Sequence, residues 1–336
     1  NIENNRWRGR AGMTAKEYNS FISPIPNQAL KHVLVSNGDE KGWYTGTICR
    51  KGNPPPPYLS HLSPHIIVGK DNNVIRHGRG IMCRSNGERY YGDWKDDNKC
   101  GHGTYHYENG DYYKGDWVDD KKDGRGTYFF KDEGTRYEGV FKDDKIDGHG
   151  RYFFDNGTCF EGKIKDEVLI SPGSFNYACG NRYVGEFNMA DGCRYWCVKH
   201  GCGVCYYSEG SHYEGEWENN ERHGQGKFFY VDGRRYEGEW KNGKNNGQGR
   251  MFMSDGSHYE GEWKNYKKNG QGKIFSSNGN LIYEGEFKDD KMNGQGKMFL
   301  SDGNLVYEGE LKDDNMNGQG KFFVEGKLQY EGEWKD

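Results

Sequence analysis

The stretch Tyr236-Glu-Gly-Glu-Trp240-Lys-Asn-Gly-Lys-Asn-Asn-Gly247-Gln-Gly249 recurs through most of the chain. Each copy opens with an aromatic residue and has a glycine two residues later, and most copies close on a glycine pair. The copies follow one another at intervals of 23 or 24 residues, with one interval of 30. Their opening residues are Tyr90, Tyr113, Tyr137, Phe160, Tyr183, Tyr213, Tyr236, Tyr259, Tyr283, Tyr307 and Tyr330. A fixed period of this length indicates a repeat architecture, in which each copy is one supersecondary unit.

The alternation within the motif predicts a strand. Alternate side chains of a strand face the same way, so Tyr236, Gly238 and Trp240 share one face and the glutamates between them share the other. This is the pattern of a half-solvated antiparallel strand. Gly247-Gln-Gly249 predicts the returning strand, with both glycines on one face. Glycine in the interior of a strand weakens it, so its regular use there suggests that another group approaches closely. We expect the Tyr and Trp rings to lie over these glycines.

Two kinds of dipeptide predict where the hairpins turn, since Asn-Gly and Asp-Gly between extended runs are strong hairpin signals. Asn269-Gly270 and Asn293-Gly294 mark one predicted turn of the unit, and Asp255-Gly256 and Asp302-Gly303 mark the other. Each unit then supplies two strands. The predicted structural positions of three regular units are Tyr213, Gly215, Trp217, Gly224, Gly226, Tyr236, Gly238, Trp240, Gly247, Gly249, Tyr259, Gly261, Trp263, Gly270 and Gly272.

The unit resembles the MORN repeat, which reads roughly Tyr-x-Gly-x-Trp, a short spacer and Gly-x-Gly. The resemblance covers about residues 67–336 well and residues 20–66 weakly. It implies an all-β fold, a single-layered, elongated and twisted antiparallel sheet built from tandem β-hairpins. Continuing the period upstream gives degenerate units at Ile67-Val-Gly69 and Tyr44-Thr-Gly46. This register assigns Gly78-Arg-Gly80 to the unit that opens at Ile67.

The chain is predicted to contain two segments. Residues 1–66 are read as degenerate N-terminal repeats that form a cap, with a loop at Pro54-Pro-Pro-Pro57. Residues 67–336 form the array, with an irregular insertion at about 188–200. Ser171-Pro172-Gly173 replaces a glycine pair and predicts a local break or bend. The proline run fits a rigid spacer or a polyproline segment that docks on another domain.

The composition supports a thin sheet. Only 32% of the residues are hydrophobic and the mean hydropathy is -1.13, so a thick aliphatic core is excluded. The chain is nevertheless 15% aromatic and contains 52 glycines, whereas disordered chains are poor in aromatic residues. No apolar run is long enough for a transmembrane helix. Residues 1–89 carry a net charge of +7 and the remainder -11, so the N-terminal part predicts an acidic partner, such as an anionic membrane.

Three stretches resemble ligand or modification sites. Cys193, Cys197, Cys202 and Cys205 could hold a tetrahedral zinc ion, and the alternative is free intracellular thiols. Asp313-Asp-Asn315-Met-Asn317-Gly318 begins like a calcium loop, but Val324 stands where such a loop needs a glutamate. Asn156-Gly-Thr158 matches a glycosylation acceptor. Because the last two stretches fall at turn positions of the repeat, a hairpin turn is the preferred prediction for both.

The sequence predicts a non-catalytic protein without a cofactor, because it contains no P-loop, HExxH, Gly-x-Ser-x-Gly or protein-kinase motif. The resemblance implies a structural scaffold or a protein–protein interaction module. It also implies an intracellular place in the cytoskeleton or a ciliary axoneme, similar to radial-spoke heads.

The expected partners are other proteins of a large assembly, which would dock a helix or strand on the aromatic and glycine face. Anionic lipid is a possible partner of residues 1–89, and no nucleic acid is expected. Two alternatives remain open at this point. One is a tether to phosphoinositides or anionic membranes, and the other is an accessory array of a larger enzyme.

Overall fold

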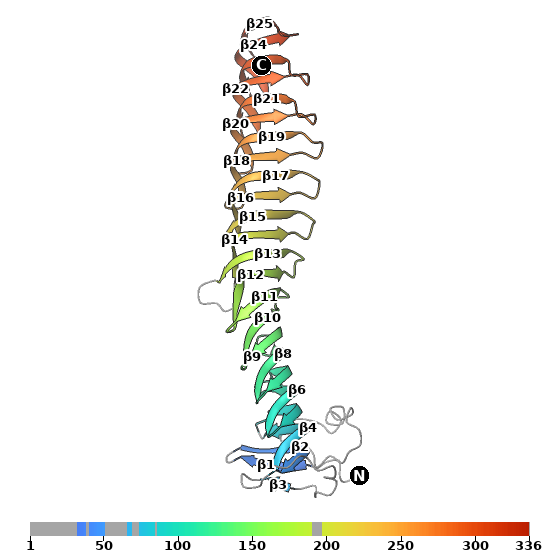
Figure 1. Ribbon diagram of the computed structural model, residues 1–336. Helices are drawn as coiled ribbons and strands as arrows, with labels where there is room; N and C mark the ends of the chain where they lie inside the picture. The colour runs from blue at the N-terminus through green and yellow to red at the C-terminus, as the bar shows by residue number, and fades with distance from the viewer. Residues whose placement is uncertain are drawn as a thin grey trace, which may run out of the picture. The chain divides into compact units, whose positions relative to one another are not determined.

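The computed structural model describes residues 32–37, 40–50, 66–68, 74–84, 86–189 and 197–335, and every regular element within these ranges is a β-strand. The chain divides into two compact units, Asn1–Ile170 and Ser171–Asp336. From β4 onward, the strands of each unit pair antiparallel with their neighbours in chain order, as a single open layer (Figure 1). The predicted fold class, an all-β sheet of tandem hairpins, is confirmed.

The strands are short and evenly spaced. Those of the first unit are β1 (His32–Asn37), β2 (Glu40–Arg50), β3 (Ile66–Val68), β4 (Val74–Arg84), β5 (Arg89–Lys95), β6 (Asn98–His106), β7 (Tyr112–Val118), β8 (Lys121–Phe130), β9 (Thr135–Lys142), β10 (Lys145–Phe153) and β11 (Cys159–Lys165). β12 (Val168–Asn176) spans the division. The remaining strands are β13 (Arg182–Met189), β14 (Cys197–Tyr206), β15 (His212–Glu218), β16 (Glu221–Phe229), β17 (Arg235–Lys241), β18 (Lys244–Phe252), β19 (His258–Lys264), β20 (Lys267–Phe275), β21 (Leu281–Lys288), β22 (Lys291–Phe299), β23 (Leu305–Lys312), β24 (Asn315–Val324) and β25 (Lys327–Trp334).

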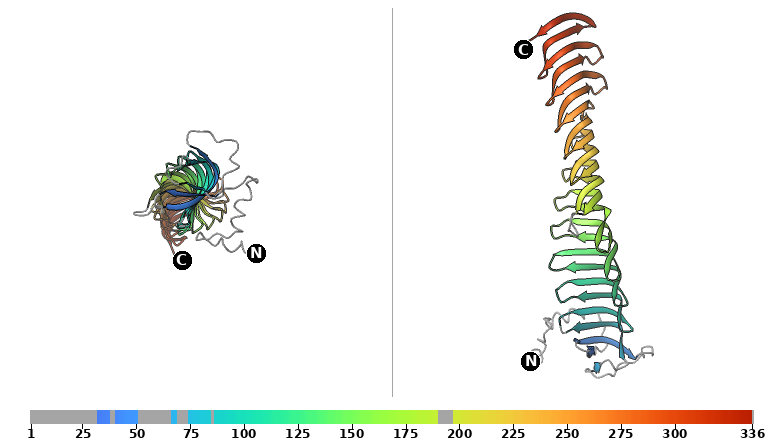
Figure 2. Two further views of the ribbon diagram at one scale, coloured as in Figure 1. Left: turned by 90° about the horizontal axis from the view of Figure 1, so that it is seen from below. Right: turned by 90° about the vertical axis from the view of Figure 1, so that its left-hand side faces the viewer.

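The register repeats from hairpin to hairpin. In the β17–β18 hairpin, Tyr236 stands opposite Met251, and Gly238 stands opposite Gly249. Gly249 then stands opposite Gly261 of β19, so the glycines form a continuous row across the strands. Within each of the two compact units, successive strands are rotated relative to one another, as the view along the strand stack shows (Figure 2). The period of the sequence is therefore the period of the sheet.

The tight turns do not lie at the predicted Asn-Gly pairs. Asn293-Gly294 lies inside β22, and the turn before it is Asp289-Asp290, with φ angles of 50° and 74°. Two successive residues with positive φ are typical of a type I′ turn, whose twist matches that of the flanking strands. Aspartate tolerates this conformation better than most residues. The prediction for Asn269-Gly270 is wrong for the same reason, whereas the turn at Asp255-Gly256 lies where the sequence placed it.

The Asn-Gly pairs instead mark a β-bulge. The φ of Gly247 is +82°, and the register of β17 with β18 shifts between Gly238 and Trp240. A β-carbon on Gly247 would meet Glu239 on the charged side of the sheet, whereas one on Gly249 would meet the Tyr236 ring. The prediction that both glycines of the pair share one face is therefore wrong. The extra residue of a bulge changes the alternation that the prediction assumed.

The N-terminal repeats pair their strands differently from the prediction. β2 pairs directly with β4, with Tyr44 opposite Met82 and Gly46 opposite Gly80. Gly78-Arg-Gly80 therefore completes the unit that opens at Tyr44, and its assignment to Ile67 is wrong. β1 pairs antiparallel with β2, and β3 pairs parallel with β1. The constant period misled the prediction because residues 51–73 lie between the two strands of one hairpin.

Two irregular stretches lie near the middle of the chain. Ser171-Pro172-Gly173 lies within β12, where Gly173 stands opposite Gly185, and the two units divide next to it. The long interval falls between β13 and β14, and residues 190–196 of it lie outside the described residues. Pro54–Pro57 and most of the predicted N-terminal cap also lie outside them, so the boundary predicted at residue 66 stays a prediction.

Candidate interaction surface

Each regular hairpin packs a tyrosine ring over two glycines on what we call the ring face, the face that carries Tyr236 and Trp240 and their equivalents. Tyr213, Tyr236 and Tyr259 are at most 3% exposed. A β-carbon on Gly226 would overlap the ring of Tyr213. The Tyr213 hydroxyl donates a hydrogen bond of 3.0 Å to the carbonyl oxygen of Glu216. Burial raises the pKa of these phenols. The tyrosine ring fits only because the glycines beneath it lack side chains, and a backbone carbonyl oxygen accepts the hydrogen bond from its hydroxyl.

The tryptophans link neighbouring hairpins. Trp240 Nε1 donates to the carbonyl oxygen of Gly226 at 3.2 Å, and Trp263 Nε1 donates to that of Gly249 at 3.1 Å. The Trp240 ring meets the Tyr213 ring edge-on, with centroids 5.2 Å apart. Edge-to-face packing of this kind is favourable beyond the area it buries. The predicted tyrosine and tryptophan positions thus form one row of rings through the regular hairpins, whereas Gly224, Gly247 and Gly270 lie at the bulges.

The second glutamate of the regular C-terminal motifs bonds to the backbone at the bulge. Glu239 Oε1 accepts a hydrogen bond of 3.0 Å from the backbone N–H of Gln248, next to Gly247. Glu262 accepts one of 3.0 Å from Gln271 in the same way. Sequence reasoning treated these glutamates only as a solvated face. Their constant distance of nine residues from the glutamine was the available signal.

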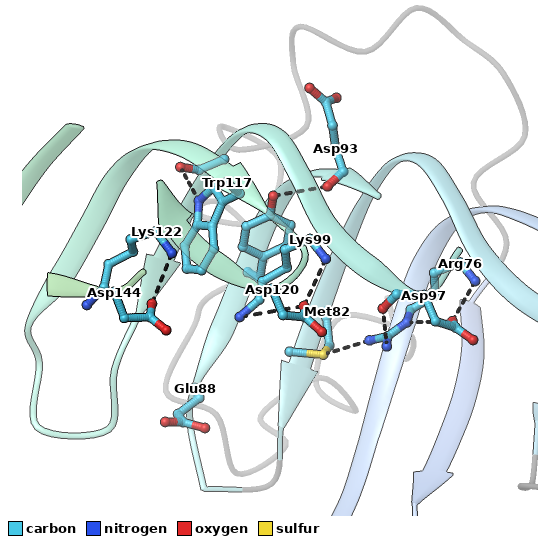
Figure 3. A network of polar contacts seen from close by, with 12 residues as sticks. Arg76, Met82, Glu88, Asp93, Asp97, Lys99, Trp117, Asp120, Lys122 and Asp144 are labelled. Atoms are coloured by element: carbon cyan, nitrogen blue, oxygen red, sulfur yellow. Dashed lines mark hydrogen bonds and ion pairs between the residues drawn. The ribbon is translucent and has the colours of Figure 1, made fainter. Parts of the chain in front are cut away.

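A row of cations lies over the rings in several hairpins (Figure 3). Lys99 Nζ lies 4.3 Å from the centroid of the Trp117 ring and 4.8 Å from that of the Tyr105 ring. Desolvation by burial lowers the pKa of Lys99, and the carboxylate of Asp120 opposes this shift. Equivalent cations are Arg76, Lys122, Lys199, Arg222 and Lys268. This row was not predicted from the sequence, although Lys99, Lys122, Arg222 and Lys268 each follow the second residue of a tight turn by two positions.

Each tight turn also bonds to the hairpin before it. Asp120 Oδ1 accepts a hydrogen bond of 2.8 Å from the backbone N–H of Lys99, and its own N–H donates to the Lys99 carbonyl oxygen at 3.1 Å. Asp144 and Lys122 repeat both bonds at 2.9 and 3.0 Å (Figure 3). The turn residue with left-handed φ therefore fixes the spacing between consecutive hairpins.

The opposite side of the sheet, which we call the charged face, carries a row of alternating charges. Lys227 pairs with Glu237 at 3.5 Å, and Arg250 pairs with Glu260 at 3.0 Å. Beside this row lies an open hollow of about 760 Å³, which is floored by glycines such as Gly238. Exposed ion pairs contribute little to stability, about 0–1 kcal/mol each. Positive and negative groups alternate here, so this face favours no single sign of partner.

The predicted zinc ligands do not form a site in the described residues. Cys197, Cys202 and Cys205 lie on β14, and Cys193 lies outside the described residues. Cys202 is exposed and Cys205 is buried, since the two residues point to opposite faces of the strand. Among the residues that the structure describes, no three His, Cys, Asp or Glu side chains group closely enough to hold a metal ion.

The other two stretches are turns. Asp313 and Asp314 form the tight turn between β23 and β24, with φ angles of 48° and 73°. Asn156 lies in the turn between β10 and β11, where its Oδ1 accepts a hydrogen bond of 2.9 Å from the Thr158 N–H. The preferred prediction of a hairpin turn is confirmed at both places. Within the described ranges, no helix is long and apolar enough to cross a membrane.

Two solved structures to which the chain is similar share little sequence with it. The TCP domain of Drosophila melanogaster SAS-4 (dCPAP), in complex with a proline-rich motif of Ana2 (dSTIL), is 11% identical over 48% of this chain and 84% of that chain, with a TM-score of 0.32. The G-box domain of the microcephaly protein CPAP is 13% identical over 70% of this chain and 100% of that chain, with a TM-score of 0.20. Neither similarity carries an argument about function. A comparison with curated proteins gave no match.

Comparison with protein families is decisive, because one family matches repeatedly and in the register of the hairpins. The MORN repeat matches nine stretches, residues 90–112, 113–135, 137–159, 198–212, 213–234, 236–258, 259–281, 283–305 and 307–327. Together these stretches cover more than half of the chain. The matches begin at the buried aromatic residue in eight of the nine stretches. By its repeats, their register and the packing of rings on glycines, the chain belongs to the MORN repeat family.

Proposed function

We propose that the protein is a non-catalytic scaffold that holds other proteins in a cytoskeletal or ciliary assembly. The MORN repeat is a non-catalytic module, and repeats of this kind suggest protein interaction. The observation that carries the proposal is that the described strands of each compact unit form one sheet, and no second sheet or helix within the described residues covers either face. A stack of identical hairpins offers the same contacts at regular intervals, as extended repeat proteins do when they bind along their surface.

The ring face is the better candidate for the docking of a helix or strand. Its rings are buried, but apolar side chains such as Met253 and Leu300 remain exposed beside them, whereas the charged face presents paired ions that water solvates well. Exposed apolar residues on a protein surface are typical of contact sites. The location in a cytoskeletal or ciliary structure is proposed from the resemblance to radial-spoke heads.

The test is cell fractionation followed by cross-linking. A tagged full chain, expressed in its own cells, is expected to remain with the detergent-extracted cytoskeleton or axoneme. Cross-links to the neighbouring proteins should map to residues 90–335. Complete extraction into the detergent-soluble fraction would contradict the proposal.

A second candidate rests on the charge asymmetry. Residues 1–89 carry a net charge of +7, and lysine and arginine near an anionic membrane each contribute about 1 kcal/mol to binding. The acidic array opposes this binding. Flotation with vesicles that contain phosphatidylserine, at physiological salt, should therefore require residues 1–89. If neither the full chain nor residues 1–89 alone float, the membrane candidate is removed.

A further inference from the structure

Lysines lie at the tight-turn ends of consecutive strands from β17 to β23. Each of these strands has one exposed lysine at the end that meets a tight turn. Strands of the earlier hairpins have other residues at this place, such as Val118, Val168, Glu218 and Glu221. We call the residues of β17 to β23 the lysine row, and they are Lys241, Lys244, Lys264, Lys267, Lys288, Lys291 and Lys312.

The lysine row lies on the charged face, nearer to the tight turns than the row of alternating charges. Lys241 follows Glu237 of the alternating row by four residues, an even spacing that keeps both side chains on one face. Across the tight turns, Lys241 stands opposite Lys244, and Lys264 stands opposite Lys267. Like charges directly opposite one another destabilise a sheet. The alternation of charge therefore ends before the tight turns, where the lysines repel one another.

Turn aspartates neutralise only part of the lysine row. A lysine that follows one tight turn pairs with the first aspartate of the next turn, as Lys267 does with Asp289 at 3.2 Å and Lys291 does with Asp313 at 3.2 Å. The next turn after Lys244 has an asparagine at that place, so this carboxylate is missing there. Within the described residues, the lysines of the row that form no ion pair are Lys241, Lys244, Lys264, Lys288 and Lys312.

The other carboxylates near the row have partners of their own. Burial lowers the pKa of Lys268 over the rings, and the carboxylates of Asp290 and Asp314 oppose this shift. Glu239 and Glu262 each come two residues before a lysine of the row, and each accepts a hydrogen bond of 3.0 Å from a backbone N–H at a bulge. An N–H group carries no charge, so these glutamates remain negative. The positive strip is therefore one lysine wide, with negative charge along its inner side.

A hollow of about 680 Å³ opens beside the row, between the β19–β20 and β21–β22 hairpins. Lys264 and Lys288, which form no ion pair, line this hollow together with the amide of Asn293. Glu286 and Asp289 line it too, but Glu286 accepts a backbone hydrogen bond of 3.1 Å and Asp289 pairs with a lysine of the row. Ammonium and amide N–H groups are donors to carboxylates, and the charged ones bind most strongly. The hollow therefore has the room and the donors for a carboxylate of a partner.

We propose that the lysine row binds an acidic, extended segment of another protein, rich in glutamate or aspartate. Strands β17 to β23 span about 29 Å at roughly 4.8 Å per step, which is the length of about nine residues of an extended chain. Blocks of like charge repel one another and keep a free chain extended. Carboxylates along such a segment are complementary to the unpaired lysines, and they relieve the repulsion between lysines that stand opposite one another.

The shape of the positive strip favours a single chain over an anionic membrane. A flat surface that meets the lysine row would also meet the row of glutamates beside it, whereas an extended chain can follow the lysines alone along the edge of the sheet. The inference goes beyond the proposed function, because the lysine row lies on the charged face and the docking proposed above uses the ring face.

The test measures the fluorescence anisotropy of labelled peptides that are mixed with the full chain. One peptide of about twelve residues, long enough to span the row, alternates glutamate with glycine, and a second has glutamine in place of each glutamate. The glutamate peptide should bind at least tenfold tighter at about 50 mM salt, and should lose at least tenfold in affinity at about 300 mM, because salt screens exposed charges. Equal affinity for the two peptides would overturn the inference.

Matched variants locate the binding. A row variant replaces four lysines that form no ion pair, and should bind the glutamate peptide at least tenfold more weakly. A control variant removes the same charge from exposed strand ends of the first unit, and should change the affinity less than threefold. Equal losses in the two variants would show attraction by net charge alone and would overturn the inference. The row variant is Lys241→Gln, Lys244→Gln, Lys264→Gln and Lys288→Gln, and the control variant is Lys95→Gln, Lys142→Gln, Lys145→Gln and Lys165→Gln.

Urea unfolding of the row variant gives an independent readout. Glutamine keeps most of the side chain and removes the repulsion between opposed lysines, so the row variant should be at least as stable as the parent chain. A clearly less stable row variant would contradict the repulsion on which the inference rests.

Two other polyanions test the class of partner. Vesicles that contain phosphatidylserine, and an oligothymidylate with the charge of the glutamate peptide, should bind the full chain more weakly than that peptide does. A vesicle or oligothymidylate that binds more tightly, and loses this affinity in the row variant, would assign the row to that partner and overturn the inference. A chain that is retained in the cytoskeleton but binds no glutamate peptide loses this inference alone. A chain that binds the peptide but is fully extracted loses only the proposed function.

Discussion

The ring of Tyr236 fills the space that a β-carbon on Gly249 would need. Such a carbon would lie 2.6 Å from Cζ of the ring, far inside van der Waals contact. The backbone of Gly249 is extended, so the conflict comes from the ring and not from the dihedral angles. This contact recurs in each regular hairpin, and it explains why a chain poor in aliphatic residues can bury a core.

Gly249→Ala should therefore destabilise the array by about 1–3 kcal/mol, the usual range for overpacking a filled interior. Urea unfolding monitored by tryptophan fluorescence measures the change. In the double variant with Tyr236→Leu, the added methyl group meets a smaller side chain, so the two effects should be less than additive. Full additivity would show that ring and glycine are not coupled.

Glu239→Ala should lower stability by about 1 kcal/mol, because it removes the acceptor for the Gln248 N–H at the bulge. Glu239→Gln keeps an acceptor oxygen and should recover most of the loss. The midpoint of urea unfolding distinguishes the two variants. If both were equally destabilised, the charge of the carboxylate and not its hydrogen bond would be responsible.

Lys99→Met should be tolerated, within about 1 kcal/mol of the parent, because Met292 and Met316 already hold this position in later hairpins. The methionine keeps the packing over the rings and avoids burying a charge. Lys99→Ala removes the aliphatic stem as well, and should lose about 1–2 kcal/mol. Thermal unfolding of the pair tests the order. An alanine variant as stable as the methionine variant would contradict a packing role for Lys99.

High pH should destabilise the array through its tyrosines. Burial raises the pKa of Tyr137 and Tyr283 to about 12, whereas an unfolded tyrosine ionises near pH 10. Above pH 10 the unfolded chain releases these protons and the folded chain keeps them. The stability that is fully present below pH 10 is therefore lost as the pH rises toward 12. Urea unfolding at pH 9, 10 and 11 should show this fall, with a smaller slope in Tyr137→Phe.

Thiol reactivity should follow burial. Cys202 is exposed and should react quickly with a disulfide reagent, whereas Cys205 is 1% exposed and its pKa is raised by burial. Burial also raises the pKa of Cys197 to about 12, so it should react slowly. Added zinc should protect none of them. Protection of Cys202 by one equivalent of zinc would restore the zinc site that the sequence suggested.

The class of fold and the buried residues of the repeat could be predicted from the sequence because they depend on local alternation. Tyr236 and Trp240 are four residues apart, an even spacing that places both side chains on the same face of a strand. The tight turns could not be placed, because Asp289-Asp290 is a weaker signal than Asn293-Gly294. Asp289-Asp290 supplies left-handed residues for the turn, and Gly294 supplies one for the bulge. Only the strand register shows which pair does which.

The surface was less predictable than the core. Lys99 reads as a solvated lysine in the sequence, and only the coiled sheet brings it over the rings of Tyr105 and Trp117. The pairing of Gly46 with Gly80 was equally hidden, because the intervening residues 51–73 are one full period long and imitate another repeat. Contacts between different hairpins depend on twist and register, neither of which the repeat motif states.

The bonds between Asp120 and Lys99 also bear on how such chains evolve. The tight turn of each hairpin contains the residue that forms hydrogen bonds with the backbone of the preceding hairpin. A duplicated 23-residue segment would contain both the turn residue and the strand backbone to which such a residue bonds. Whole repeats can therefore be gained or lost without changes in the neighbouring repeats. Insertions of other lengths within a strand would shift the turn residue away from the strand that it bonds to. The ancestry of the array is thus constrained to steps of one unit.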